Sequence, residues 1–148
     1  MTTFINASTS AGLVQTADTS GILALQTAGV TAVTIDTAKS MNLSGSYTEG
    51  VVAIGNSGTS KTLSLADGTV QTVTMTGNCT FTMPALVSGK SFILIISTGS
   101  GSFTGTFTSV KWPNNVAPTI TTTASRWDIM TFVADGTNWY GNSAQAYA

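Results

Sequence analysis

The sequence predicts an all-β protein, with an antiparallel β-sandwich or jelly-roll-like domain preceded by an extended N-terminal β arm. Three observations predict this class. The 148 residues include 28 threonines, and threonine is β-branched and favours strands. Short segments of alternating apolar and polar residues recur at roughly 8–12-residue spacing, as in sandwiches and barrels. Gly, Asn and Asp, the residues that tight turns require, stand between these segments.

Charge is scarce along the whole chain. Charged residues make up 7% of the sequence and the net charge is −1. The five basic residues lie far apart, which argues against a nucleic-acid partner because phosphate binding needs clustered Lys or Arg. A surface with almost no net charge tends to associate. We therefore expect a chain made for a permanent assembly.

The arm is predicted to cover residues 1–60. Its first 20 residues are rich in Ser, Thr and Ala and hold too few large apolar side chains to form a core, so we expect another subunit or a neighbouring protein to anchor them. The candidate anchors are the large apolar residues of this segment, Phe4, Ile5, Leu13 and Val14.

Residues 21–36 are predicted to form a hairpin. Leu23 and Leu25 alternate on one strand, and Val33 and Ile35 alternate on the other. The turn falls at residues 27–29, where Gly29 is free to adopt a positive φ. Residues 37–60 are less regular, apart from a short strand predicted around Met41 and Leu43, and the boundary with the sandwich is placed at their end.

The predicted sandwich covers residues 61–148. Its first three strands lie at 62–65, 69–75 and 79–83, and the tight turns between them predict an antiparallel meander. Cys79 is the only cysteine, so no internal disulfide can form, and its place in a strand predicts a small core residue.

The next segment is apolar on both faces of a strand, which is typical of a strand that is covered on both sides. A sandwich that stood alone would leave one of these faces in water. We therefore predict that the second face packs against a neighbouring subunit or against the arm. The candidate residues are Phe92, Ile93, Leu94, Ile95 and Ile96. This run of five residues is the longest apolar one and is too short to cross a bilayer.

The last predicted hairpin joins residues 127–134 to 137–141 around Asp135-Gly136. Aromatic residues are concentrated in this C-terminal part. Trp112, Trp139 and Tyr140 have rings that can stack on a sugar, although packing in the core or between subunits explains them more simply.

No catalytic or metal-binding pattern is found in the sequence. The chain lacks histidine, which removes Ser-His-Asp and Cys-His catalysis and imidazole metal sites. Only Asp128 and Asp135 form a close acidic pair, and Asp135 is better explained by the Asp-Gly turn. For Asp128 we expect an ion pair with Arg126 or Lys111. The sequence thus predicts a protein that is not an enzyme and holds no cofactor or metal.

Several segments resemble small virion proteins of tailed bacteriophages. The opening resembles proteins described as tail-fibre or structural proteins, and the rest is similar to phage β-sandwich modules. The residues that carry the resemblance are 5–36, Ala66-Asp67-Gly68, Phe81-Thr82-Met83-Pro84, Gly89-Lys90-Ser91-Phe92, Val110-Lys111-Trp112-Pro113 and 132–141. The matching positions are structural turns and core aromatic residues.

The resemblance implies a homotrimer on a virion surface, either a capsid decoration (cement) protein or a tail-fibre knob. The chain is short and lacks a repetitive shaft, which favours decoration of the head, with the major capsid protein as partner. The alternative is a short tail fibre or adhesin knob that binds a host surface glycan. The first residues show neither a basic nor an apolar signal segment, so synthesis in the bacterial cytoplasm and no membrane partner are expected.

Overall fold

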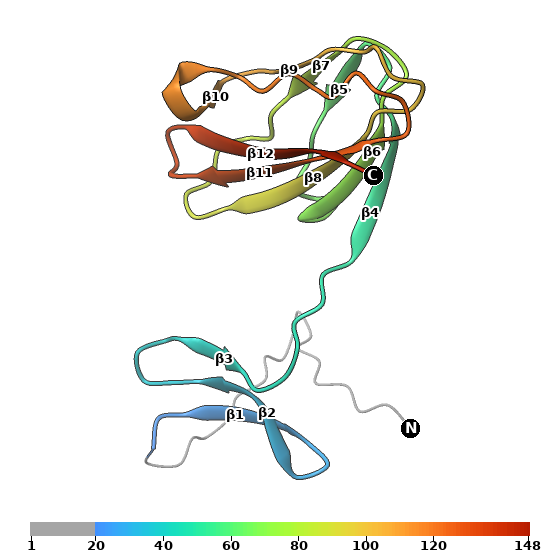
Figure 1. Cartoon of the computed structure of the whole chain (residues 1–148). Helices are drawn as coiled ribbons and strands as arrows, with labels where there is room; N and C mark the ends of the chain where they lie inside the picture. The colour runs from blue at the N-terminus through green and yellow to red at the C-terminus, as the bar shows by residue number, and fades with distance from the viewer. Residues whose placement is uncertain (1–19) are drawn as a thin grey trace, which may run out of the picture. The chain divides into compact units, whose positions relative to one another are not determined.

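The computed structural model describes residues 20–148, and the chain divides into two compact units between Thr48 and Glu49 (Figure 1). In this part of the chain all regular structure is β-strand, apart from one short 3-10 helix, η1, at Pro113–Asn115. The all-β class is therefore confirmed.

The two units meet earlier in the sequence than the predicted boundary at residue 60. β4 (Val51–Asn56) pairs with β6 (Val70–Thr74), and β5 (Ser60–Thr62) pairs with β7 (Cys79–Thr82). Both early strands thus hydrogen-bond to strands of the second unit. β4 and β5 belong to the second unit because they pair with residues distant in the sequence. The irregular local pattern of residues 37–60 does not reveal this pairing.

The first unit contains one antiparallel sheet, here called the N-terminal sheet. Its three strands are β1 (Leu23–Thr27), β2 (Val30–Ile35) and β3 (Met41–Leu43), in that order. The predicted hairpin is confirmed, and its turn is made by Ala28 and Gly29, both with positive φ. Every residue from 20 to 48 is exposed or half-buried, so the described part of this unit has no buried core.

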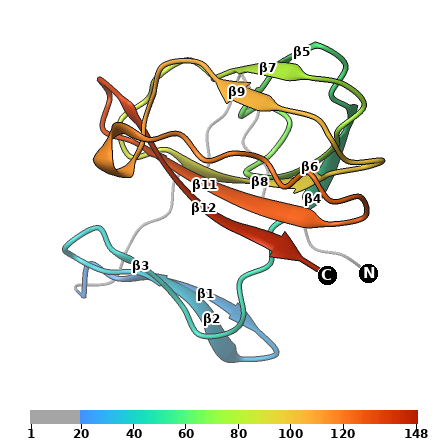
Figure 2. The ribbon, with the colours of Figure 1, turned by 45° about the horizontal axis from the view of Figure 1, so that its top comes forward.

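The second unit contains two sheets. The large sheet has six strands in the order β10-β12-β11-β8-β6-β4, and the small sheet has three in the order β5-β7-β9. The remaining strands of the unit are β8 (Ser91–Ser97), β9 (Gly105–Phe107), β10 (Val110–Lys111), β11 (Trp127–Ala134) and β12 (Trp139–Tyr147). The small sheet faces the large one, as Figure 2 shows.

Residues 51–107 form a stack of three rungs. In the large sheet β4, β6 and β8 are parallel neighbours, and in the small sheet β5, β7 and β9 are parallel neighbours. Successive strands therefore alternate between the two sheets. Each rung contributes one strand to each sheet, as in β-helical proteins, in which stacked repeats share a continuous core.

The predicted antiparallel meander is therefore wrong. The turns after β5 and β6 carry the chain across the core to the opposite sheet, and they do not return it beside the preceding strand. An alternating pattern determines which face of a strand is buried, whereas it says nothing about which strand lies next to it. Antiparallel pairing in the large sheet is confined to β8–β11 and β11–β12.

The core of the second unit lies between its two sheets. Phe81 stacks on Phe107 in the neighbouring rung with ring centroids 5.0 Å apart, and Phe92 stacks on Phe132 at 4.8 Å. Cys79 is buried among these apolar residues, as predicted. Burial of each large apolar side chain contributes about 1.5–3 kcal/mol, so this unit has a core that can hold it together.

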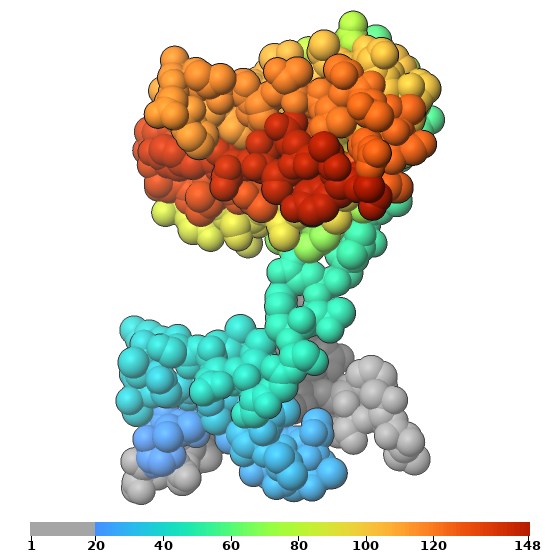
Figure 3. Space-filling model, viewed as in Figure 1, coloured from blue at the N-terminus to red at the C-terminus, as the bar shows by residue number. Residues whose placement is uncertain are grey.

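The C-terminal hairpin of β11 and β12 lies between β8 and the edge strand β10 in the large sheet. The turn at Asp135 and Gly136 is confirmed, because the Asp135 carboxylate accepts hydrogen bonds from the backbone N–H groups of Thr137 and Asn138, both at 2.7 Å. Gly136 has φ of +94°, which disfavours residues with a side chain. In the space-filling view (Figure 3) this hairpin, in red, lies beside β8, in yellow.

Candidate functional site

The face of the large sheet that points away from the core is the candidate functional surface, and we call it the outer face. Side chains alternate along each strand, so the residues between the buried ones share this face. Its larger apolar members are Val51, Val70, Ile93, Ile95, Trp127, Ile129, Val133, Tyr140 and Tyr147.

The strand register brings these side chains together in rows. Ile93 lies between Val70 on β6 and Thr131 on β11, and Ile95 lies between Thr72 and Ile129. Neighbours in their own sheet thus leave Ile93 and Ile95 half-buried. Trp127, Val133, Tyr140 and Tyr147 remain 42–50% exposed, and the uncharged polar residues Thr72, Thr131 and Asn142 stand among the apolar side chains of this face.

Charged residues lie only at the margins of the outer face. Between β4 and β12, none of the strand residues on this face is charged. Glu49 precedes β4 and accepts a hydrogen bond from the Thr69 hydroxyl, Lys90 precedes β8, and Lys111 is paired in register with Tyr140 on edge strand β10. An apolar centre with a polar rim is the usual anatomy of a protein–protein interface.

The five predicted contact residues of β8 divide between two environments. Phe92, Leu94 and Ile96 are at most 3% exposed and belong to the core of the monomer. Only Ile93 and Ile95 point outward. One face of this strand is therefore covered within the monomer, on the side of the small sheet. That a partner covers the other face stays a prediction.

The predicted arm residues Phe4, Ile5, Leu13 and Val14 lie outside the described residues, so the structure does not bear on them.

The three aromatic candidates for sugar stacking do not form one site. Trp139 is 1% exposed and its indole N–H donates to the Pro84 carbonyl at 3.0 Å, so its ring offers no face to a sugar. Trp112 is half-buried and packs edge-on against Phe107 and Phe132 on the core side. Tyr140 alone is exposed, on the outer face, beside a shallow hollow of about 340 Å³.

Tyr140 is coupled to the turn of the C-terminal hairpin. Its hydroxyl donates to the Asp135 carboxylate at 3.0 Å. The backbone N–H groups of Asn138 and Thr137 lower the pKa of Asp135 by hydrogen-bonding to its charged form. The hydrogen bond from the Tyr140 hydroxyl to the Asp135 carboxylate raises the pKa of Tyr140, because the negative carboxylate favours the neutral phenol. This end of the hairpin presents an exposed ring and a carboxylate side by side.

Asp128 has a structural role that differs from the prediction. It is fully buried, and in place of Arg126 or Lys111 its carboxylate binds hydrogen-bond donors of neighbouring segments. The donors are the backbone N–H and hydroxyl of Thr121 at 2.7 Å each, the Ala146 N–H at 2.9 Å and the Gln145 amide at 3.3 Å. Asp128 lies inward by the same two-residue alternation that buries Met130 and Phe132. The register shift in this region adds the extra residue to β12, which is the strand of Gln145 and Ala146.

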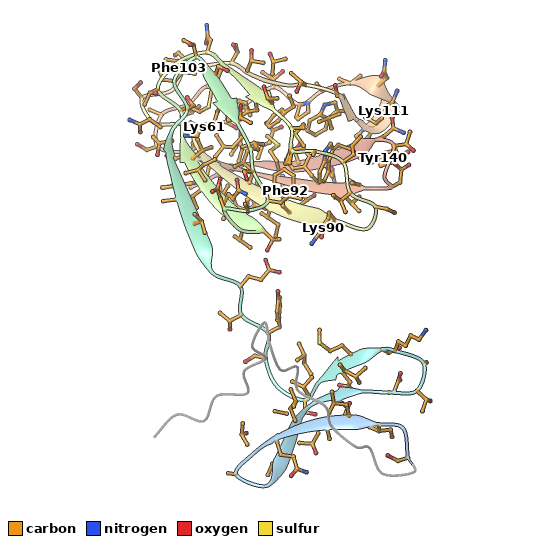
Figure 4. All side chains as sticks on the ribbon, turned by 180° about the vertical axis from the view of Figure 1, so that it is seen from behind. Lys61, Lys90, Phe92, Phe103, Lys111 and Tyr140 are labelled. Carbon is orange, nitrogen blue, oxygen red and sulfur yellow. The ribbon has the colours of Figure 1, made fainter. Side chains whose placement is uncertain are left out.

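Lys61 is a residue whose role the sequence reasoning missed. In the small sheet Lys61 is the register partner of Phe81, and Phe81 is the register partner of Phe107. The first of the three stacked strands therefore has a charged residue at the position where the next two have a phenylalanine. The Lys61 ammonium group donates to the carbonyls of Ile54 and Asn56 in β4. Figure 4 shows it at the opposite end of this unit from Tyr140. An inward-pointing charge at a sheet edge opposes the addition of further strands.

The described residues show no arrangement typical of an active site. No group of three or more His, Cys, Asp or Glu side chains in residues 20–148 is placed to hold a metal ion. Burial raises the pKa of the Cys79 thiol, which makes it a poor nucleophile. Over the same residues, no helix is both long and apolar enough to cross a membrane.

No family model, curated protein or solved structure matches this chain.

Proposed function

We propose that this chain is a non-enzymatic structural protein of a bacteriophage virion, a homotrimeric capsid decoration protein that stabilises the head by bridging capsomers. In this proposal the second unit is a β-sandwich knob on the virion surface. The N-terminal arm binds the major capsid protein.

The observation that carries the proposal is the outer face of the large sheet. A surface that is apolar across its centre and charged only at its rim favours a lasting protein partner over a soluble substrate or nucleic acid. Ile93 and Ile95 lie in the middle of this surface, where contact with a neighbouring subunit removes the most water from apolar groups.

The function in this proposal is thermodynamic. A protein that binds only the assembled shell adds its binding free energy to the stability of that shell. To act as a bridge, one subunit needs stable contacts with at least two neighbours. Each stable contact buries about 800 Å² on each partner. An anchored arm and a self-associating knob provide two such contacts.

The deciding experiment images virions that carry a tagged copy of this protein. Decoration predicts label distributed over the head in many copies. Deletion of residues 1–20 is expected to abolish binding to purified capsids while the tryptophans of the knob keep their native fluorescence. Label confined to the tail, or saturation of capsids by the truncated protein, contradicts the proposal.

A short tail fibre or adhesin knob that binds a host glycan is the second candidate, and Tyr140 is the observation that favours it. An exposed ring next to the Asp135 carboxylate offers stacking and hydrogen bonding to one sugar. A glycan array tests this candidate. Binding that Tyr140→Ala removes and Tyr147→Ala preserves supports it, whereas an array without hits argues against it.

A further inference from the structure

The tetrapeptide Ala-Asp-Gly-Thr occurs twice in the second unit, at residues 66–69 and at residues 134–137. The first copy lies between β5 and β6, and the second joins β11 to β12. Both aspartates are exposed, and both glycines have a positive φ, +129° at Gly68 and +94° at Gly136. The two copies therefore form a matched pair with the same covalent neighbours, so a difference in their chemistry must come from the fold.

An Asp-Gly bond is chemically unstable in water. The glycine backbone nitrogen attacks the protonated side-chain carboxyl of the aspartate, so a C–N bond forms, a C–O bond breaks and one water leaves, which gives a five-membered cyclic imide. One water then adds to a carbonyl of the imide. When the ring opens at the main-chain carbonyl, the chain continues through the aspartate side chain as isoaspartate, with no net change in mass. Glycine favours the attack because it has no side chain to hinder the approach.

The Asp135 carboxylate is held by three hydrogen bonds. One oxygen accepts from the backbone N–H groups of Thr137 and Asn138, both at 2.7 Å, and the other accepts from the Tyr140 hydroxyl at 3.0 Å. Rotation of the carboxyl toward the nitrogen of Gly136 must break these charge-assisted bonds. The backbone N–H groups of Asn138 and Thr137 also lower the pKa of Asp135, so the protonated form that loses water is scarcer.

The Asp67 carboxylate has no such restraint. Among residues 20–148 nothing donates a hydrogen bond to it, and the Asp67 backbone N–H makes only a long bond to the Ser64 carbonyl at 3.3 Å. The N–H of Gly68 likewise donates to no acceptor in this part of the chain. In the first copy the attacking nitrogen and the carboxyl are therefore both free of competing bonds.

We propose that Asp67 is a site of spontaneous isoaspartate formation, and that the hydrogen bonds of the C-terminal hairpin protect Asp135 from the same reaction. The inference is independent of the proposed function, because it depends only on two turns of the second unit and requires neither a partner nor a location on a virion.

The reaction affects the connection between the first and second rungs. Isoaspartate adds one carbon to the main chain before Gly68, whose carbonyl accepts a hydrogen bond from the Gln71 amide at 2.6 Å. The same amide donates to the Ser64 carbonyl at 2.7 Å. Gln71 is fully buried, and its amide oxygen has no partner in the described chain. Displacement of the Gly68 carbonyl thus removes one of the two bonds that hold this buried side chain, which is expected to destabilise the second unit.

Peptide mapping of the folded full chain tests the proposal. After incubation at neutral pH and physiological temperature, trypsin separates the two sites, with Asp67 in the peptide 62–90 and Asp135 in the peptide 127–148. An isoaspartate peptide keeps its mass, changes its chromatographic retention and resists cleavage by endoproteinase Asp-N. We expect isoaspartate at Asp67 to accumulate at least about tenfold faster than at Asp135, because reaction at Asp135 requires loss of its hydrogen bonds.

The same incubation in denaturant is the control for sequence. With the fold removed, the two identical tetrapeptides are expected to react at similar rates. Accumulation at Asp67 that is no faster than at Asp135 in the folded chain overturns the proposal. A tenfold difference that persists in denaturant also overturns it, because the difference then comes from the flanking sequence.

A variant tests the structural consequence. Asp67→Ala removes the reacting carboxyl from an exposed position, so its peptide 62–90 is expected to form no isoaspartate. Incubated unsubstituted protein is expected to unfold at a lower denaturant concentration than fresh protein, in proportion to its isoaspartate content, whereas incubated Asp67→Ala keeps its transition. Equal shifts in both proteins contradict the effect on the connection between the rungs.

Discussion

The two units of the chain use the same kind of sequence to reach different degrees of burial. Both consist of short strands with alternating apolar residues and glycine turns. In the second unit two sheets face each other, and side chains such as Phe81, Leu94 and Met130 are completely buried. In the first unit a single sheet has no second layer among the described residues, and side chains such as Leu25 and Met41 are exposed. Alternating apolar and polar residues therefore indicate that one face of a strand is apolar. Whether the chain buries that face by itself depends on a second sheet packing against it.

The largest expected effect tests this difference in burial. Phe81→Ala removes a fully buried ring from the stack with Phe107 and is expected to lower the free energy of unfolding by about 3–5 kcal/mol. Denaturant titration followed by tryptophan fluorescence reports the second unit alone. Val33→Ala in the N-terminal sheet is expected to leave this transition unchanged. A similar loss in both variants contradicts the view that each unit is stabilised separately.

Asp128 tests a polar contribution to the core of the second unit. Asp128→Ala leaves the partly buried donors of Thr121 and Ala146 without this acceptor, and we expect a loss of about 1–3 kcal/mol in the free energy of unfolding. Asp67→Ala, in an exposed turn, is the control and should change stability by less than about 0.5 kcal/mol. Equal effects of the two substitutions would show that the hydrogen bonds of Asp128 add little.

Lys61 tests how the open end of the rung stack is protected. Lys61→Met extends the apolar ladder to the first rung and removes the inward-pointing charge. We expect slow concentration-dependent association through the exposed edges of β4 and β5, measured by light scattering. Lys90→Met removes an equal charge outside this edge and is expected to remain soluble. The role of Lys61 is rejected if both variants scatter light equally.

The smallest expected effect concerns the exposed hairpin turn and its pH dependence. Because the pKa of Asp135 is lowered in the folded state, its contribution to stability is complete above the unfolded pKa and is lost as the pH falls through the folded value. Asp135→Ala is therefore expected to lower the melting temperature slightly at neutral pH. In thermal melts, the difference from the unsubstituted protein should disappear in acid. A difference that stays constant with pH would assign the effect to the backbone of the turn.

The raised pKa of Tyr140 gives this contact an upper pH limit as well. Its contribution is complete below the unfolded pKa of the phenol and is lost as the pH rises through the folded value. Tyr140→Phe is expected to remove this alkaline loss while the acid transition of Asp135 remains. Thermal melts of the variant across the alkaline range measure it, and an unchanged alkaline loss would place its cause elsewhere.

The sequence by itself determined the all-β class, the hairpins predicted at residues 21–36 and 127–141, and the burial of Cys79. These features depend on local alternation and turn residues, which a short window of sequence contains. The candidate surface was only half predicted. Ile93 and Ile95 were identified from the apolar run, whereas Val70, Ile129 and Val133 join them only through strand register.

Only the tertiary structure decided which strands are neighbours. The parallel rungs of β4, β6 and β8 join residues far apart in sequence. The four donors around Asp128 likewise come from segments on either side of β11, before it at Thr121 and after it at Gln145 and Ala146. The physical reason is that an alternating strand gains nearly the same burial against many partners. The choice among those partners depends on the packing of the whole core and on the chain connections between the sheets.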